Sequence, residues 1–184
     1  MPEVSDEILA KKALQDMQAF ETLIERYQGK LKAYILRISH FSDLEAEEIL
    51  QESFIKVWKS LNGFDDQLKF STWIYRIVHN QTISSWRKAK SRGDTERAQL
   101  EPDLFDQIAD EFDFVTGLEA QFNAEKVQAV LQQLPDKYKS VLILRFLEDK
   151  SYEEISDILQ KPPGTVATLL NRAKAQFKSC YLKS

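Results

Sequence analysis

Lys150–Lys178 reads KSYEEISDILQKPPGTVATLLNRAKAQFK, and this stretch decides the fold of the C-terminal part of the chain. Ser151, followed three residues later by Glu154, forms a capping-box pattern that predicts the start of a helix. The pair Pro162-Pro163 cannot continue that helix, so the chain must turn before a second helix over 163–181. A helix, a short turn and a helix are the layout of a helix-turn-helix, whose second helix reads the major groove of DNA.

The second helix of this motif carries polar groups that suit nucleic acid. Side chains on its expected exposed face can hydrogen-bond base edges and phosphates; they are Thr165, Thr168, Asn171, Arg172 and Lys174. An ordinary helical hairpin with a solvated basic face would show the same spacing. The pattern alone therefore leaves both interpretations open.

Helical spacing also dominates the rest of the chain. Apolar residues recur at three- and four-residue steps over 6–39, with a break near 15–18, and over 44–61, where Asp43 is the expected cap. A loop follows, and further helices are expected at 71–90, 119–134, 136–148, 151–160 and 163–181. We interpret 5–92 as one helical domain, 93–118 as an acidic linker and 119–184 as a second helical domain, so the expected fold is all-α.

Composition limits the classes of function. The 184 residues are 43% apolar and 29% charged, which is normal for a soluble globular protein. The sequence shows neither a signal-peptide pattern nor an apolar run long enough to span a bilayer, so we expect a cytoplasmic protein without membrane insertion. One cysteine, Cys180, and two histidines give no internal disulfide and no metal-ligand cluster, and no cofactor is expected.

Charge is unevenly distributed along the chain, although the formal net charge is −4. Residues 69–92 contain six basic residues and no acid, whereas 94–125 contain ten acids and one base. After Asp157 there are five basic residues and no acid. This distribution predicts two anion-binding surfaces, joined by a linker that avoids anions.

Five motifs follow one another along the chain: AFETLIERYQGKLKAYILRI (19–38), DLEAEEILQESFIKVWKSLNGF (43–64), FSTWIYRIVHNQTISSWRK (70–88), LPDKYKSVLILRFLEDKSYEEISDIL (134–159) and PPGTVATLLNRAKAQF (162–177). Together they resemble the extracytoplasmic-function (ECF) group of bacterial sigma factors, in the sigma-70 family. The resemblance implies a subunit without enzymatic activity that binds core RNA polymerase through its β′ and β subunits. It also implies recognition of the −35 and −10 promoter elements and promotion of DNA opening.

The resemblance identifies residues 43–64 as the polymerase-binding segment, which docks on a coiled coil of β′. The Gln51-Glu52 pair matches the family's Gln-Glu pair. The contact residues implied in this way are Glu48, Gln51, Glu52, Ile55 and Lys56. Aromatic and aliphatic residues at helical spacing usually form core, so we expect most of Ile55 and Trp58 to be buried.

By the same resemblance, the loop at 62–69 and the helix after it melt and read the −10 element. A base flipped from the duplex needs a pocket, whose expected walls are Phe64 and Asp65, and aromatic rings offer it replacement stacking. The residues implied at this DNA surface are Asn62, Phe64, Asp65, Lys69, Tyr75, Arg76, Asn80, Arg87 and Lys88. Trp73, by contrast, is expected to pack in the core.

The second helix of the helix-turn-helix departs from the family pattern. After Gly-Thr-Val, the family usually carries a basic residue, a serine and an arginine, whereas this chain has Ala167, Thr168 and Leu169. Two phosphate-binding cations are therefore missing, which predicts weaker −35 binding with a flatter salt dependence. Family members are often held inactive by an anti-sigma factor, so the resemblance also implies this partner.

Two other classes of function compete with this interpretation. A stand-alone helix-turn-helix regulator would use only the C-terminal motif and would need neither the segment EILQES (48–53) nor the aromatic loop and helix. A metal-dependent nuclease would use the carboxylates Asp43, Glu45, Glu47 and Glu48. An acidic helix start, favoured by the helix dipole, is the simpler account of those carboxylates.

Overall fold

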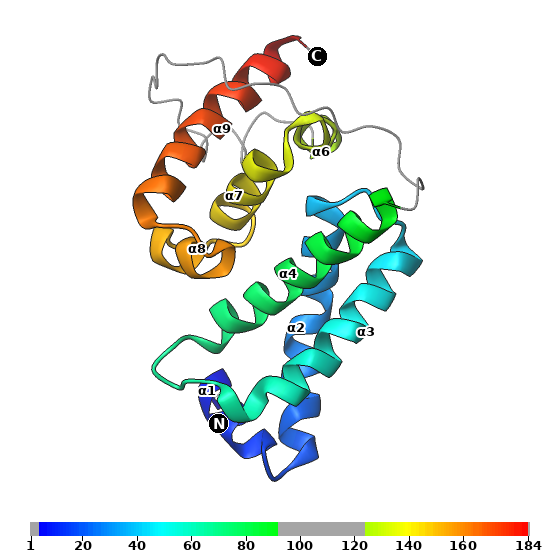
Figure 1. Cartoon of the computed structure of the whole chain (residues 1–184), viewed down its shortest axis with the longest axis vertical. Helices are drawn as coiled ribbons and strands as arrows, with labels where there is room; N and C mark the ends of the chain where they lie inside the picture. Colours follow the sequence, from blue (N-terminus) through cyan, green and yellow to red (C-terminus); the bar gives the residue numbers. More distant parts are fainter. Residues whose placement is uncertain (1–3, 92–123, 184) are drawn as a thin grey trace. The chain divides into compact units, whose positions relative to one another are not determined.

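The computed structural model describes residues 4–91 and 124–183, and most of these residues are helical (Figure 1). They divide into two compact units, the first built by α1–α4 and the second by α6, α7, α9 and most of α8. The described residues contain no strand, which confirms the all-α expectation for them. The linker expected at 93–118 and the helix start expected at 119 lie outside the described residues.

The N-terminal unit contains four helices and a short 3-10 turn. These are α1 (Asp6–Ala13), α2 (Met17–Ile38), α3 (Asp43–Ser60), the turn η1 (Leu61–Gly63) and α4 (Phe70–Ser91). The predicted break near 15–18 is confirmed between α1 and α2. The core is formed by side chains that these helices bury completely or nearly so, among them Leu23, Leu31, Tyr34, Ile35, Val57, Phe70, Ile74 and Val78.

The start of α3 differs from the sequence-based expectation. Ser42, not Asp43, is the cap: its hydroxyl accepts a hydrogen bond from Glu45 N at 3.3 Å, and Glu45 Oε2 accepts one from Ser42 N at 2.7 Å. This reciprocal pair is a capping box, which satisfies two of the backbone donors left open where a helix begins. Asp43 is the first helical residue, and its carboxylate pairs with Lys32 of α2 instead.

The C-terminal unit contains α6 (Ala124–Gln133), α7 (Asp136–Phe146), α8 (Tyr152–Leu159) and α9 (Pro163–Lys183). The capping box at α8 is confirmed, with Glu154 N donating to Ser151 Oγ at 3.2 Å and Ser151 N donating to Glu154 Oε2 at 2.8 Å. Gln160 has a left-handed backbone (φ 52°) and ends α8 before the prolines. One stripe of α9 is buried at steps of three and four residues: Val166, Leu170, Ala173 and Phe177. The opposite face of α9 is thus left for other contacts.

Candidate functional site

The exposed face of α3 carries a stripe of apolar and polar residues. Its members, which we call the α3 stripe, recur at steps of three and four residues and are all exposed: Leu44, Glu48, Gln51, Ile55 and Trp58. Leu44 is 71% exposed, Ile55 54% and Trp58 39%. The expectation that most of each residue is buried was therefore wrong for Ile55 and is confirmed for Trp58. Three large apolar side chains are thus exposed on this face of α3, with two polar ones between them.

Other residues of α3 occupy the side that faces the core. They are Ala46, Ile49, Leu50, Ser53 and Val57, and α2 and α4 pack against them. Trp58 also contacts the core, because the centroid of its ring lies 4.8 Å from that of Phe20 on α2. Its exposed part, 39% of the residue, is available to a partner.

A buried amide joins α3 to α4. Lys56 Nζ donates a hydrogen bond to Gln81 Oε1, and Gln81 Nε2 donates one to Glu52 Oε2. Gln81 is only 4% exposed, whereas Glu52 and Lys56 are exposed. The buried Gln81 side chain therefore holds Glu52 and Lys56, two predicted polymerase contacts, in position. Sequence reasoning missed it because no local pattern connects positions 25 to 29 residues apart.

Several carboxylates at the acidic start of α3 are held by contacts within the unit. Lys32 Nζ contacts Asp43 Oδ2 at 2.8 Å and Glu47 Oε2 at 2.7 Å, and these hydrogen bonds raise the pKa of Lys32. Hydrogen bonds from Ser42 lower the pKa of Glu45. Among the described residues, no three His, Cys, Asp or Glu side chains come together as ligands for a metal ion. Three of the four carboxylates of the nuclease interpretation, Asp43, Glu45 and Glu47, thus have structural partners.

The loop between α3 and α4 has an aromatic base and a polar rim. The half-buried ring of Phe64 lies 5.5 Å from Phe70 and 5.2 Å from Trp73. Asp65 is exposed and accepts a hydrogen bond from Gln67 N at 3.0 Å, which shapes the loop. Asn62 and Lys69 are exposed at its two ends. These four predicted −10 residues are therefore brought together on one loop.

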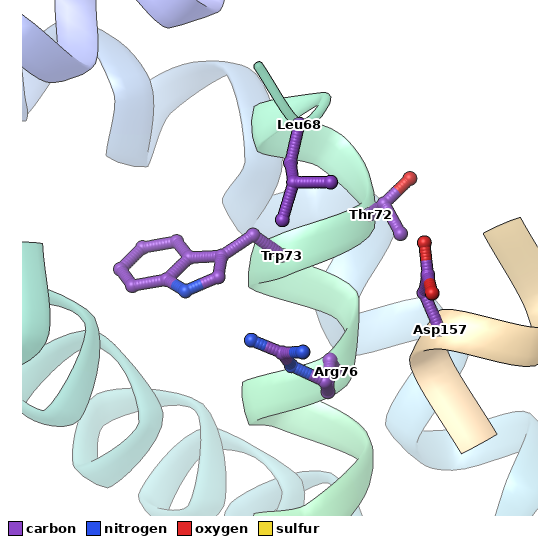
Figure 2. A pocket seen from close by; sticks show the side chains of 5 residues that line it. All are labelled: Leu68, Thr72, Trp73, Arg76 and Asp157. Carbon is purple, nitrogen blue, oxygen red and sulfur yellow. The ribbon is translucent and has the colours of Figure 1, made fainter. Parts of the chain in front are cut away.

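The helix that follows presents only part of its predicted DNA surface. Figure 2 shows Arg76 on α4, one turn beyond Trp73. Arg76 is half-buried, and Asn80, Arg87 and Lys88 are exposed, as a DNA-facing surface requires.

Two aromatic residues of α4 face the core instead. Trp73 is 7% exposed, which confirms its assignment to packing. Tyr75 is 3% exposed and its ring lies 5.2 Å from Tyr34, which corrects the expectation that it faces DNA. The reason is that Tyr75 precedes the buried residues Val78 and His79 by one turn, and so shares their face of the helix.

The second helix of the helix-turn-helix places its polar residues on the outer face. Thr165, Thr168, Asn171 and Arg172 are exposed. Thr168 Oγ1 donates to Gly164 O at 2.9 Å, so its oxygen can still accept a hydrogen bond. Lys174 is half-buried, with its ammonium 5.4 Å from the ring centroid of Phe146. Lys174 thus lies closer to α7 than the sequence pattern indicates.

Within the described residues, none of the helices combines the length and the apolar character needed to cross a membrane.

Comparison with known proteins matches the two units separately. The family model of Sigma-70 region 2 matches residues 23–92, and that of Sigma-70, region 4 matches 124–177. The chain is 34% identical to the ECF RNA polymerase sigma factor SigW of Bacillus subtilis, with 94% of this chain and 96% of that one covered. It is 30% identical to the ECF RNA polymerase sigma-E factor of Haemophilus influenzae, with 96% and 95% covered.

Two solved structures share the fold at lower sequence identity. One is CnrH in complex with the cytosolic domain of CnrY, with a TM-score of 0.66, 19% identity and 95% of each chain covered. The other is the sigma factor RpoE in complex with the anti-sigma factor NepR from Bartonella quintana, with a TM-score of 0.66 and 18% identity. It covers 88% of this chain and 95% of that one. These two likenesses establish the fold alone.

Proposed function

The chain belongs to the extracytoplasmic-function group of the sigma-70 family, and from this membership we propose that it is a promoter-specificity subunit of RNA polymerase. It binds core polymerase and directs initiation by recognising −35 and −10 elements and promoting DNA opening. The observation that carries this function is the order of the two matches, region 2 and then region 4, on two separate helical units. A stand-alone regulator would need only the second.

The α3 stripe is the proposed polymerase-binding surface. Burial of the exposed Ile55 and Trp58 against the β′ coiled coil would remove apolar area from water. Polar side chains around them would set the orientation of the complex; the proposed ones are Glu48, Gln51, Glu52 and Lys56.

The loop at 62–69 and the exposed face of α4 are the proposed −10 surface. A flipped base would lie against Phe64, and the exposed Asn62, Asp65 and Lys69 would read its edge or hold its backbone. Stacking on an aromatic ring contributes about 1–3 kcal/mol per base, enough to offset much of the cost of unstacking. Arg76, Asn80, Arg87 and Lys88 would then hold the unpaired strand. Binding energy alone drives this opening, and no catalysis is proposed.

The outer face of α9 is the proposed −35 surface, with Thr165, Thr168, Asn171 and Arg172 toward the major groove. We assign residues 5–92 to region 2, 93–118 to the linker and 119–184 to region 4. The protein acts with core polymerase in the cytoplasm. An anti-sigma factor is a further proposed partner, supported by the solved sigma factor of the same fold in complex with one.

Gel filtration with sigma-free core polymerase, followed by sequencing of transcripts from genomic fragments, tests this function. We expect a stable complex that starts transcription at discrete sites. The double variant Gln51→Ala, Glu52→Ala should lose the complex while keeping its helical circular dichroism. If the protein binds specific duplex DNA by itself but forms no complex with core polymerase, the result would instead support the stand-alone regulator.

A further inference from the structure

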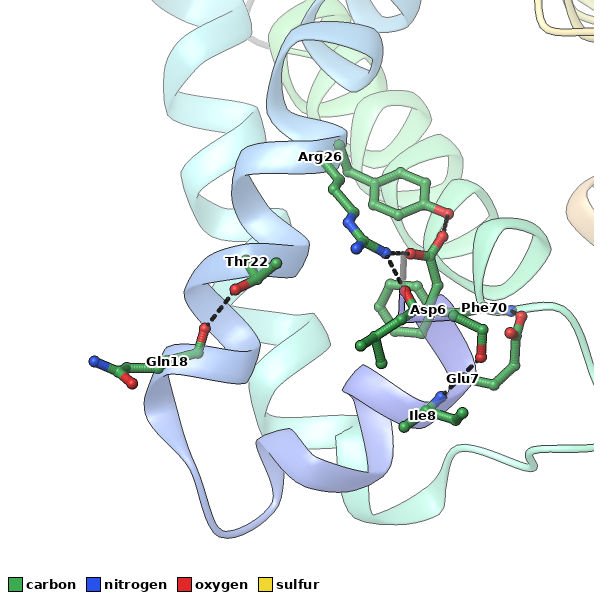
Figure 3. Close-up of polar contacts among 10 residues, drawn as sticks. Asp6, Glu7, Ile8, Gln18, Thr22, Arg26 and Phe70 are labelled. Atoms are coloured by element: carbon green, nitrogen blue, oxygen red, sulfur yellow. Dashed lines mark hydrogen bonds and ion pairs between the residues drawn. The ribbon is translucent and has the colours of Figure 1, made fainter. Parts of the chain in front are cut away.

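Helix α1 precedes the residues matched by the region 2 model, which begins at residue 23. The first turn of α1 is anchored on α2 (Figure 3): Asp6 Oδ1 accepts from Arg26 Nη1 at 2.6 Å, and Asp6 Oδ2 accepts from Tyr27 Oη at 2.5 Å. Burial, reinforced by the Asp6 carboxylate, raises the pKa of Tyr27, so its hydroxyl stays protonated and donates to Asp6. The residues that follow Asp6 are thus held in place.

The next residue, Glu7, reaches the start of α4. Phe70 N donates to Glu7 Oε1 at 3.1 Å, across 63 positions of sequence (Figure 3). The first turn of α4 contains no acidic residue of its own, and a lysine, Lys69, precedes it. Backbone N–H groups at a helix start lack partners within the helix, and the helix dipole favours a negative charge there. Glu7 supplies both the acceptor and the charge from another helix.

One turn further along α1, Lys11 forms an ion pair with Asp66 of the loop. The Lys11 ammonium lowers the pKa of Asp66. The loop is therefore held at three points: by the ring of Phe64 against Phe70 and Trp73, by Lys11 at its middle, and by Glu7 at its end. Two of these three contacts come from α1.

We propose that α1 positions the loop that reads the −10 strand, with Glu7 and Lys11 as positioning residues that do not touch DNA themselves. This inference rests on the proposed function. The exposed loop residues Asp65 and Lys69 directly precede Asp66 and Phe70, the two points where α1 holds the chain. A loop held in its binding conformation loses less conformational freedom when DNA binds, so the two contacts raise both affinity and selectivity for the strand.

The test uses holoenzyme assembled from the full chain and core polymerase. The probe is a pool of random single-stranded oligonucleotides, from which bound sequences are recovered and sequenced. Wild-type holoenzyme should enrich a discrete motif. Lys11→Glu and Asp66→Lys should each lower that enrichment about two- to five-fold, as expected for an exposed ion pair. The double variant Lys11→Glu, Asp66→Lys restores the pair with inverted charges and should restore the enrichment.

Glu7→Ala should lower the enrichment about five-fold, the usual effect of losing a helix cap. Glu7→Gln keeps an acceptor oxygen and should retain most of it. Lys12→Glu makes the same charge change as Lys11→Glu at the neighbouring exposed lysine, and should leave the motif intact.

Two further measurements separate positioning from stability. The melting temperature and the affinity for core polymerase are measured for every variant. A purely structural role would lower the melting temperature and the affinity, but it would leave the selected motif unchanged at temperatures where the protein is folded. An unchanged motif in Glu7→Ala and Lys11→Glu overturns the inference while the proposed function stands. Equal losses for Lys11→Glu, Lys12→Glu and the double variant also overturn it, since charge alone would then explain them. A wild-type holoenzyme that enriches no motif overturns the proposed function, and the inference with it.

Discussion

At the scale of single residues, the side chain of Gln81 holds two oppositely charged residues of α3 in position. Its amide oxygen accepts from Lys56 and its amide nitrogen donates to Glu52, so one side chain holds both in fixed positions on α3. A neutral amide that satisfies a cation and an anion at once is hard to replace. Neither an apolar residue nor a single charge offers both a donor and an acceptor.

We expect Gln81→Ala to lower the free energy of unfolding by about 1–3 kcal/mol, the usual cost of losing hydrogen bonds to charged groups. It should also weaken core-polymerase binding, because Glu52 and Lys56 lose their fixed positions. Urea unfolding and a binding titration measure the two effects. Gln28→Ala, at an exposed glutamine of α2, is the matched control. Wild-type polymerase affinity in Gln81→Ala would contradict the role given to this contact.

Whether the burial of a single residue was predicted correctly from the sequence depended on the residues that face it from neighbouring helices. Trp73 was placed correctly in the core, whereas Tyr75, only two positions later, was wrongly placed at the DNA. Ile55 has helical spacing typical of core, yet it is 54% exposed, and Ile49, Leu50 and Val57 occupy the core side of α3. Periodicity identifies the faces of a helix, but which face is buried depends on neighbours distant in sequence.

At the scale of elements, two of the helices begin with the same device. Ser42 and Glu45 start α3, and Ser151 and Glu154 start α8, each pair satisfying a backbone N–H of the other residue. Devices of this kind are local, which explains why the helices of the described residues could be predicted from sequence. The contact of Glu7 with the start of α4 spans 63 residues and could not be.

We expect Ser42→Ala to destabilise the protein by about 1 kcal/mol at neutral pH, the usual effect of removing a helix cap. The hydrogen bonds from Ser42 lower the pKa of Glu45 below its ordinary 4.5, so the folded state binds the proton less tightly than the unfolded state. This contribution is complete above pH 4.5 and is lost as the pH falls through the folded pKa. Urea unfolding of the wild type and of Ser42→Ala should show that their difference in free energy of unfolding becomes smaller at acidic pH. A difference independent of pH would contradict the capping box as its source.

Because α9 lacks two basic residues of the family pattern, restoring one should strengthen DNA binding. Ala167→Arg restores a basic residue where the family usually has one, on the helix proposed to read the −35 element. We expect tighter promoter binding by the holoenzyme and a slope of log K against log salt that is steeper by about 0.9, the effect of one added phosphate contact. Leu182→Arg adds the same charge to an exposed position at the far end of α9 and is the control. An equal steepening in both variants would assign the effect to net charge.

At the scale of the whole molecule, one chain carries two proposed DNA-binding surfaces with different tasks. The C-terminal surface on α9 suits duplex DNA, because a helix fits the major groove. The N-terminal surface combines an aromatic base with exposed cations, which suits an unpaired strand. Since both are on one polypeptide, binding of one surface raises the effective concentration of the other at the same promoter.

If the two surfaces bind DNA separately, substitutions on each should weaken promoter binding independently. Asn80→Ala on α4 and Arg172→Ala on α9 should each weaken promoter binding by about 1–3 kcal/mol, as for one lost base or strand contact. Because the two residues lie in different units, the double variant should lose the sum of the two free energies. Fluorescence anisotropy of the holoenzyme on a promoter identified from its transcripts measures all three.

A shorter DNA with only the −10 element provides the control for this pair. On that fragment Asn80→Ala should keep its full effect, whereas Arg172→Ala should bind like the wild type, since its proposed contact is absent. If Arg172→Ala weakens binding to the fragment as much as to the whole promoter, the contact is not at the −35 element. If the double variant loses much less than the sum, the two surfaces do not bind independently, and the bivalent account of this chain is wrong.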